Sequence, residues 1–203
     1  MSQRDSLEDA WEAPANLGRT INGPKGEFYN ALSVDGYWMT FTSNHPGGCG
    51  GQDLWISHRQ DKRNDFGWET PANLGCIVNS AATENSPFLF NDEVTGQMLL
   101  HFSSNRPGGA GLMYIYVSPF SDETGTFGPP VPVAELNRAA DDCCPFLRKD
   151  GLEMIFASGR AGGSGKIDLY VSTRKTVLDP WWKAVNLGST VNSEASDFRP
   201  TLS

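Results

Sequence analysis

The feature that most constrains this chain is a threefold internal repeat. A glycine-rich phrase followed by alternating apolar and aromatic residues occurs at residues 42–56, 103–117 and 157–171. Glycine permits positive φ and close backbone approach, and the Val, Ile, Tyr and Trp that follow favour a half-buried strand. Each copy is therefore predicted to be a loop followed by a strand. Repetition of such a unit is typical of propellers, solenoids and arrays.

A second repeated phrase sets the period of the repeat. The sequence WEAPANLG, which contains Asn16, recurs as WETPANLG with Asn73, 57 residues later. The shorter phrase KAVNLG places Asn186 a further 113 residues on, about two such steps. Asp-Gly pairs at residues 35–36 and 150–151 lie between apolar runs, which is a strong hairpin signal. No segment shows a sustained helical period with capping residues, so helix should be scarce.

Four short strands per repeat predict an all-β fold, a β-propeller of four-stranded antiparallel blades, in preference to a sandwich. We expect a single domain over residues 1–203, with a fourth strand near 11–17 and a trailing first strand over 198–203. Between them lie repeats of about 27–75, 84–136 and 142–188. The chain then holds at least three blades, with the ring incomplete within it. Because unpaired strand edges recruit partners, we expect self-association or a place in a longer ring.

Four phrases carry a resemblance to a known family. They are the Asp-Gly turns, the loops SNHPGG and SNRPGG, the Asp-Leu-Trp or Asp-Leu-Tyr that begins at Asp53 and Asp168, and WExPANLG. From Trp11 onward the chain resembles the WD-like β-propeller repeat family of the Tol-system periplasmic propeller and OmpA-associated envelope proteins. The middle repeat departs from the pattern, since Tyr114 stands where the others have aspartate. The resemblance implies a non-enzymatic propeller that binds a protein or carbohydrate partner at its channel-mouth face.

Charge and hydropathy exclude several classes of partner. The net charge of -8 argues against a nucleic-acid partner, which would need clustered lysine and arginine. No apolar run approaches the roughly 20 residues that cross a bilayer, so no membrane span is expected. The first residues, MSQRDSLEDAWEAP, lack the apolar core of a signal peptide, although the resembling family is often extracytoplasmic. The compartment is left open.

The cysteines predict neither a metal site nor a disulfide framework. None of the four follows the C-x-x-C spacing of a zinc site, and three occupy positions that other residues fill in sister repeats. Small buried fillers are the favoured interpretation. No cofactor is expected. A calcium ion beside Asp53 and Asp168 is an alternative, but these carboxylates are better suited to capping the amides of their own loops. The four cysteines are Cys49, Cys76, Cys143 and Cys144.

One carboxylate precedes each predicted first strand. In propellers of this kind that strand lines the central channel, so four converging acids could bind a cationic group or serve as general acid and base. The alternative is that each acid accepts backbone N–H groups of its own inter-blade turn. The four acids are Glu27, Glu84, Asp142 and Asp197.

Three basic residues share one position in the glycine-rich loops, on the face where the acids are expected. His45 stands where the other copies have Arg106 and Arg160, and it is the best candidate for proton transfer near neutral pH. A solvated loop residue is the alternative. If the chain is an enzyme, it is a small-molecule hydrolase or lyase in which His45 works with Glu27, Glu84 or Asp142 as acid and base. No Gly-x-Ser-x-Gly elbow supports a serine hydrolase.

The remaining charged residues of that face are predicted to bind a ligand. Besides His45, the adjacent pair Cys143 and Cys144 is the other divergence between repeats at the channel mouth. Two divergences are too few to decide between binding and catalysis. The candidate binding residues are Asp142, Asp197, Arg106 and Arg160.

Overall fold

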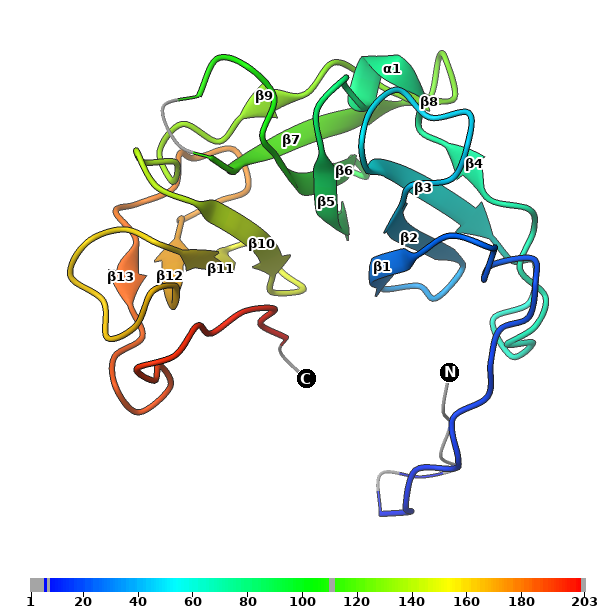
Figure 1. The fold of residues 1–203 in the computed structure, drawn as a ribbon, viewed down its shortest axis with the longest axis horizontal. Coiled ribbons are helices and arrows are strands. Elements are labelled where there is room, and N and C mark those ends of the chain that lie inside the picture. Colours follow the sequence, from blue (N-terminus) through cyan, green and yellow to red (C-terminus); the bar gives the residue numbers. More distant parts are fainter. Residues whose placement is uncertain (1–5, 7, 110–111, 202–203) are drawn as a thin grey trace.

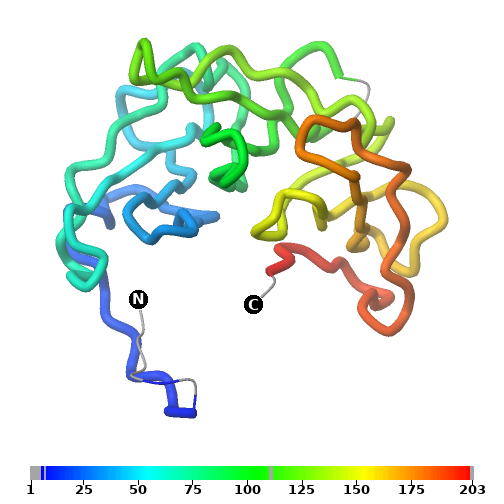
Figure 2. The backbone as a smooth tube through the Cα atoms, turned by 180° about the vertical axis from the view of Figure 1, so that it is seen from behind, coloured from blue at the N-terminus to red at the C-terminus, as the bar shows by residue number. Residues whose placement is uncertain are grey.

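The computed structural model describes residues 6, 8–109 and 112–201. Three antiparallel sheets follow one another around an open arc (Figure 1). The tube view from behind shows the same arc, with both ends of the chain on its open side (Figure 2). Among the described residues the only helix is the four-residue α1 (Gly75–Val78), and none could span a membrane. The predicted all-β propeller with at least three blades and an incomplete ring is confirmed.

Each sheet is one blade, numbered here along the chain. Blade 1 has the spatial order β1 (Glu27–Leu32), β2 (Trp38–Ser43), β3 (Asp53–His58) and β4 (Ala72–Asn73). Blade 2 contains β5 (Glu84–Asn91), β6 (Met98–Ser104), β7 (Tyr114–Ser121) and β8 (Thr126–Phe127), with β9 (Val131–Pro132) also paired to β7. Blade 3 contains β10 (Asp142–Leu147), β11 (Glu153–Ser158), β12 (Asp168–Thr173) and β13 (Val185–Asn186). The first strands β1, β5 and β10 lie nearest the centre of the arc (Figure 1).

The hydrophobic core lies between the blades. Successive strand residues point to opposite faces, so neighbours in sequence enter different clusters. In β5, Leu89 packs with Leu54 of blade 1, whereas Phe90 packs with Phe156 of blade 3. All four side chains are almost fully buried. Blade 2 is therefore apolar on both faces, which fixes its two neighbours against it.

A bulge interrupts the inner strand of every blade. The strand register shifts in β1, β5 and β10, and one residue in each bulge has a positive φ. Positive φ is uncommon outside glycine, and a bulge bends its strand. The fold therefore repeats this strained conformation at its axis, where four such residues line a cavity of about 110 Å³. They are Tyr29 (φ 53°), Ser86 (51°), Cys144 (56°) and Arg199 (56°).

The two segments expected to be terminal strands lie outside all three sheets. Residues 11–17 and 198–201 have no strand assignment, and residues 202 and 203 lie outside the described part of the chain. The C-terminal segment is attached through a parallel bridge between Ile167 and Ser196 and through the Asp197 N–H, which donates to the Ile167 carbonyl at 2.9 Å. Neither segment is paired as a strand with another described segment. Closure by self-association or a longer ring stays a prediction.

The cysteines divide into two pairs. Cys49 and Cys76 form a disulfide with a Cα–Cα distance of 5.6 Å, so their prediction as buried fillers is wrong. The reason is tertiary: the glycine-rich loop of blade 1 lies against the linker to blade 2, where the Gly51 N–H donates to the Ala82 carbonyl at 2.9 Å. Cys143 and Cys144, in contrast, are free thiols and buried.

Candidate active site

The four predicted acids occupy the same structural position. Each accepts a hydrogen bond from the main-chain N–H four residues earlier, which closes the turn that leads into the inner strand. The alternative interpretation, in which each acid accepts a backbone N–H of its own inter-blade turn, therefore describes all four acids. The donors and N–O distances are Gly23 to Glu27 (3.1 Å), Ser80 to Glu84 (2.9 Å), Arg138 to Asp142 (2.6 Å) and Ser193 to Asp197 (2.8 Å).

The structure brings each predicted basic residue to the acid of its own blade. The carboxylate of Asp197, by contrast, accepts hydrogen bonds only from Ser193 among the described residues. Three acid–base contacts of one geometry result, one in each blade. The pairs are His45 Nε2 to Glu27 Oε1 at 3.0 Å, Arg106 Nη2 to Glu84 Oε1 at 3.2 Å, and Arg160 Nη2 to Asp142 Oδ1 at 2.6 Å.

In blades 2 and 3 the pair is part of the framework. Glu84 is 0% exposed, and its two oxygens accept bonds from Ser80, Ser104 and Arg106. Arg106 Nη2 also donates to the Val78 carbonyl at 2.7 Å, so the guanidinium ties its loop to the linker from blade 1. A carboxylate so enclosed has no access to substrate. Blade 3 repeats these contacts with Asp142, Ser158, Arg160 and the Leu136 carbonyl.

Blade 1 departs from this pattern. The Glu27 side chain is 14% exposed and lines a cavity of about 410 Å³ beside the N-terminal segment. Its Oε1 accepts a hydrogen bond from the Gly23 N–H and lies 3.0 Å from His45 Nε2, whereas Oε2 has no hydrogen bond to a described residue. The partner is an imidazole, 24% exposed and edge-on to the Trp55 ring at 5.6 Å. Glu27 is therefore open to a ligand on one side and held by a titratable group on the other.

Gly23 makes room for this imidazole. A Cβ at position 23 would overlap the His45 ring, so a larger residue here would displace the imidazole from this position. The sister blades have Ser80 and Arg138 at the equivalent position. The sequence analysis did not identify Gly23. The signal that could have identified it is a glycine four positions before the acid Glu27.

A second reactive group lies at the axis. Cys144 Sγ is 3.6 Å from Cys143 Sγ and 3.4 Å from Ser86 Oγ, within the cavity lined by the bulge residues. The hydrogen-bonded contact between the two thiols lowers the pKa of Cys144 to about 6, with help from Ser86 and Arg199 and against the effect of burial. The same contact, together with burial, raises the pKa of Cys143. Cys144 is therefore an ionisable thiol at neutral pH.

The two loop aspartates cap their own loops, as the favoured interpretation expected. Asp53 accepts bonds from the Gly50 N–H and the Asn73 amide, both at 3.1 Å. Asp168 repeats this with Gly165 and Asn186, both at 2.9 Å. These bonds lower the pKa of Asp168 against the effect of burial. In the described part of the chain, no three His, Cys, Asp or Glu side chains gather closely enough to hold a metal ion.

Solved structures with a similar fold are glycoside hydrolases and a sialidase. A GH43_12 protein from a capybara gut metagenome matches with a TM-score of 0.62 and 16% identity over 91% of this chain and 36% of its own. The α-L-arabinofuranosidase PaAbf62A from Podospora anserina matches with a TM-score of 0.52 and 13% identity over 92% of this chain and 55% of its own. Hadza microbial sialidase Hz136 matches with a TM-score of 0.52 and 12% identity over 76% and 36%. No protein-family profile and no curated protein matches.

These comparisons correct two predictions. The resemblance to the Tol-system and OmpA-associated propellers is wrong, because the matching structures are propeller glycoside hydrolases. The prediction of a non-enzymatic, WD-like binding propeller is wrong as well, since the matching propellers are hydrolases. The phrases that suggested the first family build turns, caps and loops. Any propeller needs these, so they identify the blade and not the family. The chain spans about a third to just over half of the three structures.

Proposed function

We propose that this chain carries the acid–base group of a hydrolase that acts on a carbohydrate. Glu27 is the reacting carboxyl group, and His45, whose Nε2 lies 3.0 Å from Glu27 Oε1, is its ion-pair partner. One observation carries the proposal: of the four ring acids, Glu27 alone combines a cavity in the described chain with a partner that can exchange a proton. The likeness of the fold to arabinofuranosidase and GH43_12 structures supports the carbohydrate class.

The chemistry follows from the position of the two oxygens of Glu27. A carboxylate in the cavity accepts a proton from water or a hydroxyl group and returns it to the leaving oxygen. His45 does not line the cavity, so it acts through Glu27 by orienting Oε1 and by supplying or removing positive charge beside it. His45 is thus a positioning residue.

The cavity suits a sugar in size and in chemistry. Its volume of about 410 Å³ lies in the usual range for small-molecule sites, about 300–1,000 Å³. Three asparagines provide amides for hydroxyl groups, and apolar side chains provide a surface for the C–H face of a ring. The lining includes Asn16, Asn22, Asn30, Leu17, Ile21, Leu32, Met39 and Phe41.

The number of carboxylates bears on the bond that is cleaved. Glycosidases use two carboxyl groups, and Glu27 is the only one among the described residues that line this cavity. Hydrolysis of an ester on a sugar requires only one base and a water molecule. Both kinds of bond therefore belong in the assay.

Turnover of chromogenic glycosides and of acetylated sugars tests the proposal. We expect Glu27→Gln to reduce the rate by at least about a hundredfold, because the amide cannot take the proton. His45→Arg should fold normally, since arginine is the residue of the sister blades, yet lose activity because its charge is fixed. Glu93→Gln, at an exposed pair with Lys149, is the matched control.

Three results would each contradict a part of the proposal. Hydrolysis of none of these substrates by the unmodified chain would remove the proposed activity. Full activity in Glu27→Gln would remove Glu27 from the chemistry. Full activity in His45→Arg would remove only the imidazole from its supporting role.

A further inference from the structure

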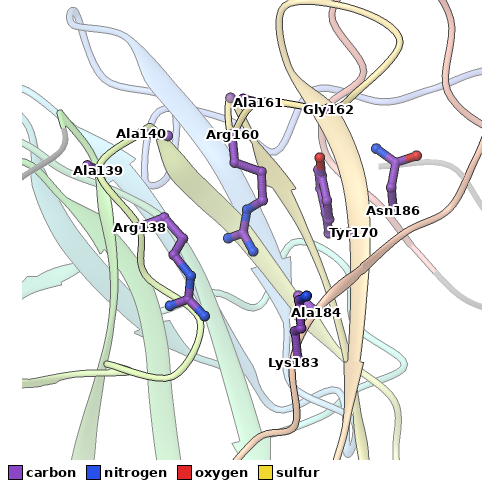
Figure 3. A pocket seen from close by; sticks show the side chains of 11 residues that line it. Arg138, Ala139, Ala140, Arg160, Ala161, Gly162, Tyr170, Lys183, Ala184 and Asn186 are labelled. Carbon is purple, nitrogen blue, oxygen red and sulfur yellow. The ribbon is translucent and has the colours of Figure 1, made fainter.

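A cavity of blade 3 has three cationic residues in its lining. It encloses about 660 Å³ between the β11–β12 loop, the linker before β10 and the approach to β13. Figure 3 shows Arg138, Arg160 and Lys183 around it, with Tyr170 and Asn186 on the β12–β13 side. Six of its eleven lining residues are Ala or Gly, which leaves the cationic groups accessible.

Two of these cations are departures from the repeat. Arg138 holds the position of Gly23, Ser80 and Ser193, and at all four positions the main-chain N–H caps the acid. Lys183 lies three residues before Asn186, as Thr70 lies before Asn73 in blade 1. A residue that is repeated in every blade usually has a structural role in the blade. The side chains of Arg138 and Lys183 are not repeated in the other blades, so this structural role does not account for them.

The third cation is already neutralised. Arg160 pairs with Asp142, which is 0% exposed and does not belong to the cavity lining. Arg138 donates from Nη1 to the Asn137 carbonyl at 2.7 Å, which uses one of the five N–H groups of a guanidinium. No carboxylate belongs to the lining. The positive charges of Arg138 and Lys183 are therefore available to a ligand.

We propose that this pocket binds an oxyanionic group carried by a saccharide, either the carboxylate of a uronic acid or a sulfate ester. Arginine and lysine together are suited to oxyanions, which guanidinium groups bind in a bidentate manner. The net charge of -8 repels a polyanion at long range, so the pocket suits an isolated anionic group. The saccharide part rests on the proposed function, whereas the anion part rests on the pocket alone.

Calorimetric titration at low ionic strength tests this inference. The ligands are a carboxylated trisaccharide, a sulfated trisaccharide, their neutral parent and inorganic sulfate. We expect at least one charged trisaccharide to bind tenfold or more tightly than the neutral parent and than inorganic sulfate. The tighter of the two identifies the oxyanion. Added salt should weaken this binding, because it screens the charges.

Three variants locate the site. Arg138→Ser and Lys183→Thr restore residues that sister blades carry, so they should fold normally and each weaken binding about tenfold. Lys149→Thr removes an exposed charge from the β10–β11 turn and should leave binding unchanged. Unchanged binding in both pocket variants, or no binding of any anion, would overturn the pocket. If the charged trisaccharides bind no more tightly than inorganic sulfate, the proposal that the ligand is a saccharide is wrong. Glu27→Gln should leave this binding intact, which separates the result from a failure of the proposed hydrolysis.

Discussion

Removing the Arg106 side chain tests whether the acid–base pairs hold the blades together. In Arg106→Ala, Glu84 keeps its bonds from Ser80 and Ser104 but loses its counter-charge while 0% exposed. Breaking a buried ion pair by removing one partner costs about 3–5 kcal/mol. The Val78 carbonyl also loses its donor, and unpaired buried groups cost about 1–3 kcal/mol. Because these two effects overlap, we expect Arg106→Ala to lower the free energy of unfolding by about 4 kcal/mol in total.

Urea denaturation measures this loss. With a slope of about 2 kcal/mol per molar urea, a loss of about 4 kcal/mol lowers the midpoint by about 2 M. Arg148→Ala is the control, because Arg148 forms ion pairs with Asp150 and Glu153 at the exposed β10–β11 turn, and such surface pairs contribute about 1 kcal/mol or less.

The double variant Glu84→Gln with Arg106→Met separates the ion pair from its surroundings. Because this variant leaves no unpaired charge, it should be more stable than the sum of its single changes predicts. A midpoint for Arg106→Ala no lower than that of Arg148→Ala would refute the reasoning. The buried pair would then be no stronger than a surface pair.

Two further predictions concern pH. Contact with Cys143, aided by Ser86, lowers the pKa of Cys144 to about 6. The rate at which iodoacetamide alkylates Cys144 should therefore rise with pH around 6 and level off by about pH 7. A rate that keeps rising to pH 8.5 would show that Cys144 is an ordinary thiol. Burial, with the charge of Arg174, lowers the pKa of His101 to about 3, so the folded state keeps His101 neutral while the unfolded state binds a proton below about pH 6.5. The folded state should therefore lose stability as the pH drops from 6.5 toward 3. Urea midpoints measured at pH 7 and 4.5 should differ less in His101→Leu than in the unmodified protein. An equal difference in both proteins would exclude His101 as the source of the pH dependence.

The blades could be predicted from the sequence, and so could the equivalent positions of the acids and basic residues in each blade. Turns, alternation and glycine-rich loops are encoded by residues close together in the chain, and the repeat multiplies each signal. Equivalent positions in equivalent blades meet equivalent neighbours. Aligning His45 with Arg106, and Glu27 with Glu84, was therefore enough to predict that each basic residue would share a face with an acid.

The open cavity at Glu27 and the disulfide were decided only by the tertiary structure. Glu27 and Glu84 are aligned in sequence, yet one lines a cavity and the other is enclosed, because exposure depends on what the linkers and neighbouring blades cover. The Cys49–Cys76 bond likewise depends on a loop meeting a linker 27 residues away. Such contacts join segments whose separation carries no local signal. The sequence thus determined the repeating unit, and packing between units determined which of its copies is open to a ligand.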